Sequence, residues 1–573
     1  MNNDEITNTA RKFAIKNAID YGHAKTSIVV NKIISIYPEL RNNIKDIFSK
    51  VNNIVAEVNA LSKDALTKEF EPYFDEFEIK EKEIAEKTSK PRMILEGAVE
   101  GNFITRYAPE PNGYLHIGHA LNIFLGQEFA HIYKGKDFLY FDDTNPTKED
   151  EKFVEEIKKN LDWLGVKFDK EYYASDNIEK IYEFARLLIK SGKAYACICS
   201  TDEIKSNRMN KIGCKHKNQS SEENLNIFEK MLKNEFNEED VVIRLALDMN
   251  SKNSALRDPV ILRIKKHKHY KQGNKYVVWP TYDFNTPIND SLQGITDVFR
   301  DKWYEIRSEL YRILLESLGL KAAQIHPYAR LEIKDNITSK REINELIKQG
   351  IIKGFDDPRL VTLSALRRRG INPEAIRNFV LKFGISKAER EIDIDMLLAE
   401  NRKVVDKNAK RLFFVENPIK LEIEKIDEKL KNIKIKLHPN KDLGYKTYKL
   451  SNIFFITGDD AKNLKINDII LLKDLFKIKI TKLDNNIKAA IVEGAKDQVR
   501  VIHWVNEGNY ENALIKKIEP ILKNNEINPT SMRDIKGYVE KYVDELDEGN
   551  IVNFERMGFF KLDNKKERIF FSL

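Results

Sequence analysis

The sequence predicts a multidomain protein with a parallel α/β core between a helical N-terminal region and an all-β C-terminal region. Its 573 residues exceed what one hydrophobic core organises, so several domains are expected. From about residue 100, short β-rich runs alternate with amphipathic helices, which is the pattern of a parallel sheet. After about residue 420, strand-like runs separated by Gly, Asn and Asp turns predict an all-β end.

Residues 1–90 are expected to be helical, because apolar residues recur there at helical spacing. The spacing is clearest in Ile28–Ile36 and Val51–Val58. The charged run Ile79–Lys90 ends at Pro91 and is read as a linker or an exposed helix end. Nothing in this region indicates chemistry, which leaves an interaction with a protein partner open.

Later segments are assigned in the same way. Phe138–Phe141 is a candidate buried strand, and residues 373–383 form a predicted helix within a helical stretch at 356–424. The remaining predictions are helices over Asp150–Leu164 and Lys180–Ser191, and strands at Ile433–Leu437, Ile453–Ile456 and Phe559–Leu562.

Composition narrows the function only slightly. The net charge of +7 is mildly basic, which fits a polyanionic partner without requiring one. No apolar run approaches the ~20 residues of a membrane span, and the first residues lack a signal-peptide core. Three cysteines are too few for a disulfide scaffold. We therefore expect a cytoplasmic protein that does not contact a membrane, and we expect it to be a monomer.

The most informative segment is His116-Ile-Gly-His119, where an apolar run turns into a helix. A helix N-terminus binds phosphate through its free N–H groups and its partial positive charge. Gly118 lets a base or ribose lie against the backbone, and the imidazoles can donate to phosphate oxygens. The alternative is an ordinary turn, but ten histidines in the whole chain make this tetrapeptide a rare coincidence. We favour a nucleotide site.

Two further segments are ambiguous alone. Asp142 follows the Phe138–Phe141 strand, where it could hold a substrate ammonium or simply belong to an Asp/Asn/Pro turn. In the polar loop near 337–341, Lys340 and Arg341 could bind the β- and γ-phosphates while Ser339 caps the next helix. The alternative there is a solvated helix start.

The three cysteines cluster with a histidine. Cys197, Cys199, Cys214 and His216 form a C-x-C…C-x-H pattern within a short stretch. Three thiolates and one imidazole would complete a tetrahedral structural Zn²⁺ site. The alternative is a set of small buried thiols beside a polar histidine. We favour zinc, although the C-x-C spacing is tighter than usual.

Taken together, these segments resemble the class I aminoacyl-tRNA synthetases, which share a Rossmann-like catalytic core. His116–His119 and Ser339–Arg341 resemble their two signature motifs. Longer matches point to the glutamyl/glutaminyl branch, and within it to the archaeal type of glutamyl enzyme. They are Pro109–Ala120, Phe141–Pro146, Trp279–Phe284, Leu366–Gly370 and Glu548–Phe560.

The resemblance implies a domain plan. It places the catalytic core at 95–355, with an acceptor-stem domain inserted at about 170–280. A helical stem-contact region would follow at 356–424, and β-barrels that bind the anticodon would occupy 425–573. Residues 1–90 would be an extension.

The resemblance also implies the chemistry. Glutamate would attack the α-phosphate of ATP, and the terminal ribose of tRNA would then take the glutamyl group. Catalysis would rest on alignment and charge stabilisation, with Mg²⁺ beside the phosphates. His116, His119 and Lys340 are the expected catalytic residues. The expected ATP-binding residues are Pro109, His116, Gly118, His119, Ser339, Lys340 and Arg341.

Four residues match substrate contacts of the family: Arg106, Asp142, Tyr282 and Arg300. Arg300 stands where glutamyl enzymes carry Arg and glutaminyl enzymes an uncharged residue. A buried pair of arginines needs an anion, which favours glutamate. The alternative for Arg300 is a surface ion pair with Asp297 or Asp301.

Two residues depart from the family pattern. Tyr140 stands where an arginine is common, and Thr286 stands where relatives place Asn or His. Both are expected to alter the surroundings of the substrate pocket.

The expected partners are L-glutamate and tRNA(Glu), with tRNA(Gln) left open, and Arg411 is our candidate for an anticodon contact. Three other functions stay open: a glutaminyl enzyme, a relative that modifies a tRNA base, and an inactive tRNA-binding scaffold. Arg300 opposes the first of these, the β-rich C-terminal half opposes the second, and the intact ATP motifs oppose the third.

Overall fold

The computed structural model describes residues 3–21, 23–37, 40, 44–61, 63–70, 94–484, 486–493 and 499–573. The chain divides into two compact units, Met1–Pro91 and Arg92–Leu573. Among the described residues, no helix combines the length and apolar character needed to cross a membrane.

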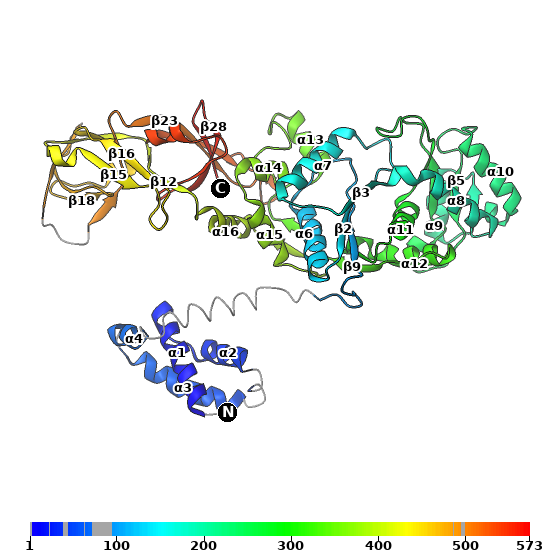
Figure 1. Ribbon diagram of the computed structural model, residues 1–573, viewed down its shortest axis with the longest axis horizontal. Coiled ribbons are helices and arrows are strands. Elements are labelled where there is room, and N and C mark those ends of the chain that lie inside the picture. The colour runs from blue at the N-terminus through cyan, green and yellow to red at the C-terminus, as the bar shows by residue number, and fades with distance from the viewer. Residues whose placement is uncertain are drawn as a thin grey trace. The chain divides into compact units, whose positions relative to one another are not determined.

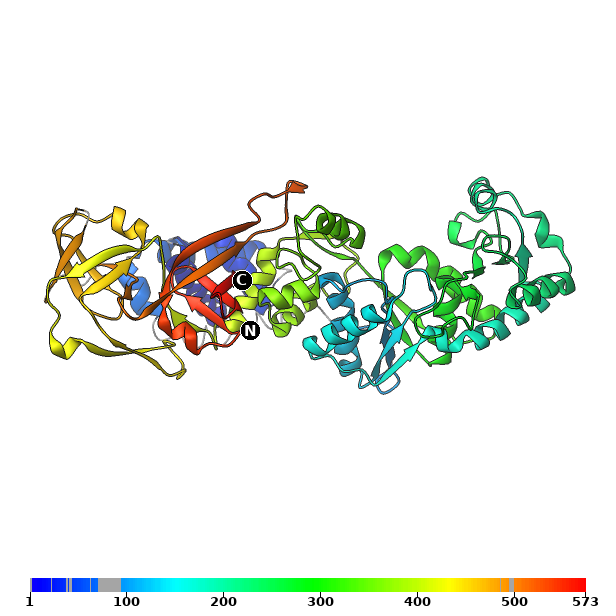
Figure 2. The ribbon, with the colours of Figure 1, turned by 90° about the horizontal axis from the view of Figure 1, so that it is seen from above.

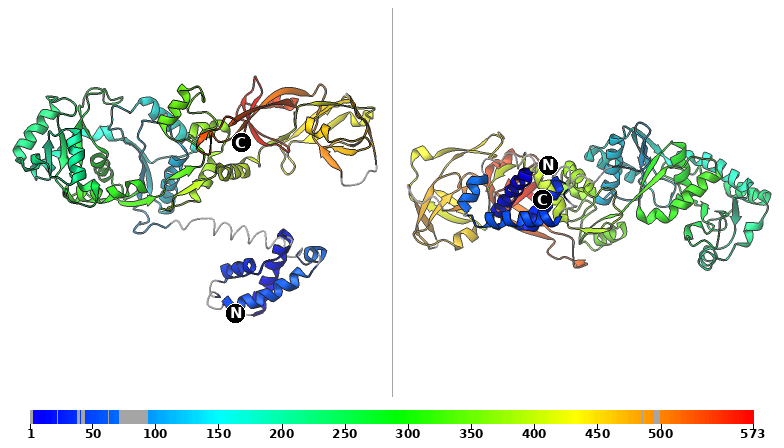
Figure 3. Two further views of the ribbon diagram at one scale, coloured as in Figure 1. Left: turned by 180° about the vertical axis from the view of Figure 1, so that it is seen from behind. Right: turned by 90° about the horizontal axis from the view of Figure 1, so that it is seen from below.

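The first unit is helical, as expected (Figure 3). Its helices are α1 (Asn3–Tyr21), α2 (Thr26–Ile36), α3 (Ile44–Asn59) and α4 (Lys63–Phe70). The apolar residues that predicted α2 and α3 supply its core, including Val29, Ile33, Val51 and Val58. The charged run at 79–90 lies outside the described residues.

The second unit contains a parallel α/β core, which confirms the predicted fold class (Figure 1). Strands β1 (Ile104–Tyr107), β2 (Lys136–Phe141) and β3 (Lys170–Tyr173) pair in parallel in the order β1-β2-β3. A second parallel pair, β8 (Asp297–Asp301) with β9 (Gln324–Tyr328), continues this arrangement. The Thr296 amide beside β8 donates to the Ile104 carbonyl of β1, at 2.9 Å.

Helices cover this core and lead to the C-terminal half. In chain order the α-helices of the second unit are α6 (Ile117–Ile132), α7 (Glu151–Leu164), α8 (Ile178–Lys190), α9 (Thr201–Asn210), α10 (Ser221–Leu232), α11 (Tyr282–Leu292), α12 (Ser308–Ser317), α13 (Lys340–Lys348), α14 (Leu363–Arg369), α15 (Pro373–Leu381), α16 (Ile394–Val405) and α17 (Gly458–Lys462). Short 3₁₀ turns are η3 (Ala174–Asn177), η4 (Lys215–Asn218), η5 (Ser254–Leu256), η6 (Lys302–Arg307), η7 (Glu428–Leu430) and η8 (Lys541–Glu545).

An antiparallel sheet interrupts the core between β3 and α11. Its strands pair in chain order: β4 (Ala194–Cys197), β5 (Val242–Leu245), β6 (Val260–Ile264) and β7 (Val278–Pro280). Helices α8 and α10 pack against β4 and share one core with this sheet.

Two seven-stranded sheets form the C-terminal half, where both sheets curl (Figure 2). The strands of the first sheet, in spatial order, are β12 (Lys410–Leu412), β27 (Ile551–Phe554), β28 (Gly558–Asn564), β29 (Ile569–Ser572), β23 (Tyr510–Ile518), β26 (Met532–Glu540) and β13 (Phe414–Glu416). Those of the second are β21 (Arg500–Ile502), β18 (Ile469–Leu472), β19 (Lys477–Lys482), β20 (Ile487–Ile491), β14 (Ile419–Ile423), β17 (Ile453–Ile456) and β22 (Val505–Asn506).

Smaller strand pairs complete the unit. They are β10 (Leu331–Ile333) with β11 (Arg390–Ile392), β15 (Asn432–Lys436) with β16 (Tyr445–Lys449), and β24 (Leu522–Lys523) with β25 (Glu526–Ile527). The region 356–424, expected to be helical, thus also holds β11 to β14. Strands β12 to β14 are edge or inner members of the two large sheets, so the β-rich half begins at Lys410.

Candidate active site

The His116–His119 motif lies at the start of α6, beside the end of β1. His116 is the N-cap: its Nδ1 accepts from the Gly118 amide at 3.1 Å. The His116 amide in turn donates to His119 Nδ1 at 3.1 Å. Because both Nδ1 atoms accept, the proton of each neutral ring resides on Nε2.

Both histidines are neutral near pH 7. Burial, followed by the charges of His119 and Arg330, lowers the pKa of His116 well below its usual value. Burial and then Arg330 lower the pKa of His119 to about 4. Each imidazole therefore presents one Nε2–H donor, rather than a charge, to a ligand.

Gly118 is constrained by its surroundings. A Cβ at this position would lie 2.9 Å from His116 Cε1 and 3.3 Å from the Leu331 carbonyl oxygen. The capping ring of His116 therefore occupies the space that any larger residue would need.

A cavity of about 280 Å³ opens beside this helix start. It gathers seven of the predicted residues from five segments of the chain: Arg106, His116, Gly118, His119, Asp142, Tyr282 and Arg300. Residues that sequence reasoning missed also line it, including Glu110, Tyr304, Tyr328 and Arg330. Glu110 belongs to the Pro109–Ala120 match and could have been found there, whereas the other three carry no local pattern and reach the cavity only through the fold.

Arg106 and Arg300 converge on Asp290 in the floor of the site. Arg106 Nε donates to Asp290 Oδ1 at 3.0 Å, and all three side chains are at most 5% exposed. Arg300 Nη2 lies 3.6 Å from Asp290 Oδ2, which is too long for a hydrogen bond. Within the part of the chain that the structure describes, the buried Nε and Nη2 of Arg300 have no hydrogen-bond partner. The surface ion pair considered for Arg300 is therefore wrong.

Asp142 lies at the end of β2 and is held by two neighbours. Its Oδ1 accepts from Asn285 Nδ2 at 2.7 Å, and its Oδ2 accepts from Thr286 Oγ1 at 3.2 Å. Tyr140 OH accepts from the same Asn285 amide at 2.7 Å. Both residues that depart from the family pattern thus act on Asp142, directly or through Asn285.

The surroundings of Asp142 favour a bound cation. Burial raises the pKa of Asp142 to about 8, and the carboxyls of Glu110, Glu149 and Asp143 contribute in the same direction. A positively charged group beside it would reverse this effect by stabilising the carboxylate.

The second signature motif lies at the start of α13, outside the cavity lining. Lys340 Nζ donates to the Asn112 carbonyl and lies 4.4 Å from the centre of the Phe153 ring. Ser339 is the N-cap residue, but its side chain makes no capping hydrogen bond, so the predicted capping role is wrong. Arg341 is exposed. Pro109 accepts the Asp142 amide at 3.1 Å through its carbonyl.

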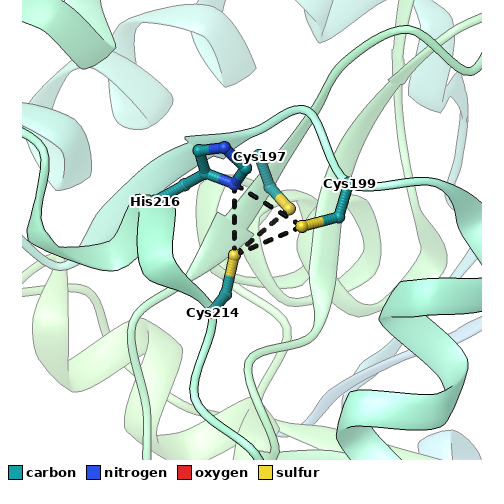
Figure 4. A group of neighbouring side chains, drawn as sticks. All are labelled: Cys197, Cys199, Cys214 and His216. Atoms are coloured by element: carbon teal, nitrogen blue, oxygen red, sulfur yellow. Dashed lines mark hydrogen bonds between the residues drawn. The ribbon is translucent and has the colours of Figure 1, made fainter.

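The Cys/His cluster is assembled at the end of β4 and at η4 (Figure 4). Cys214 Sγ lies 3.6 Å from Cys197 Sγ, 3.7 Å from Cys199 Sγ and 3.3 Å from His216 Nδ1. Bonds of about 2.3 Å at tetrahedral angles place two sulfur ligands of zinc about 3.8 Å apart. The four side chains therefore fit a Cys₃His zinc site.

Arg411 lies on β12 at a different cavity, of about 570 Å³, which is lined mainly by residues of β12, β15 and β27 and of the turn after β18. Its guanidinium donates to Asp406 and to the Ala409 carbonyl. The cations that line this cavity are Arg411, Lys434, Lys436, Lys473 and Arg556. Asp474 and Glu555 also line the cavity and pair with Lys473, so its wall carries an excess of positive charge that is suited to an anion.

Comparison with known proteins gives consistent matches. Residues 102–407 match the family model "tRNA synthetases class I (E and Q), catalytic domain". Residues 409–497 and 501–563 match two models described as the anti-codon binding domain of the same class.

Curated relatives match over nearly the whole chain. A glutamate–tRNA ligase of Nitrosopumilus maritimus is 39% identical, covering 99% of both chains. One from Pyrococcus furiosus is 38% identical, covering 98% of this chain and 97% of the relative. Among solved structures, a glutamate-tRNA synthetase from Elizabethkingia anophelis matches with a TM-score of 0.41 at 20% identity, over 53% of this chain and 70% of that one.

Proposed function

The chain belongs to the family of class I tRNA synthetases for glutamate and glutamine; it is an ATP-dependent ligase that attaches glutamate to tRNA, and we propose how its residues do so. The observation that carries the proposal is the Arg300 guanidinium, which is buried with two nitrogens that lack a hydrogen-bond partner among the described residues.

Charge balance selects glutamate in this pocket. Arg106 and Arg300 carry two positive charges against the one negative charge of Asp290. The γ-carboxylate of glutamate supplies the missing anion and accepts from Arg300 through charge-assisted hydrogen bonds. A carboxamide would leave a net positive charge buried, which is costly. The centre of the Tyr282 ring lies 5.7 Å from Arg300 Cζ, so Tyr282 forms part of the same pocket wall.

The other end of the amino acid is positioned by Asp142. Its carboxylate pairs with the substrate ammonium, while Asn285 and Thr286 hold it in place. The α-carboxylate is then free to attack the α-phosphate of ATP. That oxygen–phosphorus bond forms as the bond to pyrophosphate breaks, which gives glutamyl-adenylate.

The nucleotide is held at the start of α6. The Nε2–H groups of His116 and His119 donate to phosphate oxygens, and Gly118 leaves room for the nucleotide over the backbone. Lys340 exchanges its Asn112 carbonyl partner for phosphate oxygens, with Pro109, Ser339 and Arg341 beside it. Mg²⁺ accompanies ATP and offsets phosphate charge.

The remaining assignments concern the rest of the chain. The terminal ribose hydroxyl of tRNA(Glu) attacks the glutamyl carbonyl and releases AMP. The cationic cavity around Arg411 reads the anticodon, and the Cys/His cluster holds a structural zinc ion. The protein acts as a cytoplasmic monomer, with domains divided at about 90, 355 and 409 and residues 1–90 available to a protein partner.

Aminoacylation of purified tRNA(Glu) and tRNA(Gln) with labelled glutamate and labelled glutamine tests this function. Charging of tRNA(Glu) with glutamate, and no charging with glutamine, is expected. The same assay decides whether tRNA(Gln) also accepts glutamate. Charging with glutamine alone would overturn the proposal in favour of the glutaminyl enzyme.

A further inference from the structure

One face of the inserted antiparallel sheet carries a buried arginine beside the Cys/His cluster. Arg244 on β5 is paired with Tyr195 on β4, and Cys197 follows Tyr195 by two residues on the same strand. Because side chains alternate between the two faces of a strand, these three residues share one face, with Arg244 as the diagonal neighbour of Cys197. The side chain of Arg244 is fully buried. The sheet therefore places a guanidinium next to one of the four predicted zinc ligands.

The guanidinium of Arg244 has few partners in this environment. Its Nε donates to the Asp258 carbonyl oxygen at 2.9 Å, and its Nη1 donates to Cys197 Sγ at 3.8 Å, a long contact that the large sulfur atom permits. Its Nη2 is buried and has no hydrogen-bond partner among the described residues. Within that part of the chain, Cys197 Sγ is therefore the one side-chain acceptor of Arg244.

The buried charge of Arg244 is not balanced by a carboxylate of the described residues. The Asp258 carboxylate pairs instead with Lys217 Nζ at 3.2 Å, and it accepts from the Tyr195 hydroxyl at 3.0 Å. A buried cation that lacks an anion is costly. Because the charges of Asp258 and Lys217 offset each other, Arg244 leaves one positive charge that needs a counter-charge beside the cluster.

We propose that Arg244 is the charge partner of the zinc site: its guanidinium offsets the negative charge of the three-thiolate centre and donates a hydrogen bond to Cys197 Sγ. The inference rests on the zinc ion proposed for the cluster. Three thiolates and a neutral imidazole around Zn²⁺ carry one net negative charge, which matches the unbalanced charge of Arg244. Groups outside the ligand shell that hydrogen-bond to ligands orient them and strengthen metal binding. Arg244 therefore favours Cys197 as a metal-bound thiolate.

The test measures metal binding by the full-length protein with Arg244→Met, which removes the charge and the donors but keeps much of the side-chain volume. Competition with a chromophoric chelator should show that zinc affinity falls roughly ten- to hundredfold. With Co²⁺ in place of zinc, loss of the hydrogen bond to Cys197 raises the energy of the sulfur lone pairs. The thiolate-to-Co²⁺ charge-transfer bands should therefore move to longer wavelength, a signature that a loss of stability alone would not produce.

Three further variants separate charge from packing. Tyr195→Phe removes a buried hydrogen bond from the same face of the sheet, but it keeps the ring whose centre lies 5.6 Å from Arg244 Cζ. It should leave the zinc affinity and the Co²⁺ bands unchanged. Arg244→Lys retains the charge and should retain most of the affinity. Arg244→Gln, which keeps a donor for the Asp258 carbonyl, is the second uncharged variant for the case where Arg244→Met does not fold.

Wild-type zinc affinity in a folded uncharged variant would overturn the inference. A loss of affinity without a shift of the Co²⁺ bands would also overturn it, because Arg244 would then only support the fold. The same holds if Arg244→Lys loses as much affinity as the uncharged variants. Wild-type protein that binds neither zinc nor Co²⁺ would overturn the zinc site itself, and failure to charge tRNA(Glu) would overturn the proposed function, so the three failures are distinguishable.

Discussion

At the scale of single residues, the pocket is organised by which charges are paired in the free enzyme. Asp290 satisfies Arg106 with a 3.0 Å hydrogen bond and accepts from Tyr311 OH at 3.2 Å. Its carboxylate is thereby occupied, which leaves the guanidinium of Arg300 available. Arg300, which the family resemblance associated with amino-acid choice, is thus the residue with hydrogen-bond donors available to the substrate.

Arg300→Gln should lower kcat/KM for glutamate by a factor that corresponds to about 2–4 kcal/mol, because charge-assisted hydrogen bonds are lost. Steady-state charging of tRNA(Glu) measures the change. Arg312→Gln, an exposed arginine on the neighbouring α12, is the matched control and should charge normally. Wild-type kinetics in Arg300→Gln would contradict the assignment.

Glutamate binding should release a proton near pH 7. In the free site the pKa of Asp142 is about 8, so its carboxyl is mostly protonated, and the substrate ammonium stabilises the ionised form. Affinity should therefore fall as the pH drops below about 8. Titration calorimetry in buffers of different ionisation enthalpy measures the number of protons released when glutamate binds.

Glutarate is the control ligand for that measurement, because it has both carboxylates but no ammonium group. Its binding should release no proton through Asp142. If glutamate and glutarate release the same number of protons, the pairing of Asp142 with the ammonium is wrong.

At the scale of elements, the C-terminal half reaches the second signature motif. The segment between β23 and β24 packs Ile521 into one apolar cluster with Ile337, Ile343 and Leu346, which flank or belong to α13. The Leu522 amide donates to the Asp335 carbonyl at 3.1 Å. The position of Lys340 at the start of α13 therefore depends on the segment that connects β23 to β26, two strands of a seven-stranded sheet.

Ile521→Ala should reduce the rate of charging although Ile521 does not line the active-site cavity. Loss of a buried isoleucine side chain costs about 2–5 kcal/mol of local packing, which loosens the support of α13. Ile478→Ala removes an equally buried isoleucine from the other large sheet and should destabilise the protein without lowering kcat. Equal kcat values in the two variants would refute this coupling.

The Cys/His cluster gives the second prediction at the scale of elements, which concerns its zinc content. Protein purified without chelator should contain about one zinc ion per chain by elemental analysis, and Cys214→Ser should lose it. Because the ligands join β4 to η4, metal loss should also lower the Tm of the inserted domain. Zinc-free protein with unchanged Tm would exclude a structural metal here.

At the scale of the whole molecule, recognition and chemistry are assigned to separate cavities in one compact unit. The Arg411 cavity is lined by residues of the C-terminal β-rich half, and the active-site cavity lies at the parallel core. Deleting residues 425–573 would remove Ile521 as well as the sheets, so it would also disturb α13. Substitution of single cations separates the two functions better.

Arg411→Gln should reduce discrimination between tRNA(Glu) and its anticodon variants, while the KM values for ATP and glutamate stay unchanged. The reason is that the Arg411 guanidinium would contact a base or phosphate of the anticodon. Arg411 is far in sequence from every residue that lines the active-site cavity. Competition binding between tRNA(Glu) and its anticodon variants measures this discrimination. Lys488→Gln, which removes a charge from β20 outside the cavity, is the control, and equal behaviour of both variants would place anticodon reading elsewhere.

The sequence by itself determined the features whose residues are close together in the chain. Helical spacing identified α2 and α3, and the alternation of runs identified the parallel core with its β-rich end. The His116–His119 motif and the four Cys/His residues also lie within short segments, so spacing was enough to group them. The strand boundary at Lys410 was missed, because β12 to β14 are short and gain their stability from distant partners.

Only the tertiary structure decided the features that depend on distant residues. Asp290 lies 184 positions from Arg106, and no pattern links it to either arginine, yet it determines which guanidinium keeps buried nitrogens without a hydrogen-bond partner among the described residues. The same holds for Ile521, which packs against α13. The physical reason is that charge balance and packing depend on distances in space, which a chain acquires only when its elements have packed.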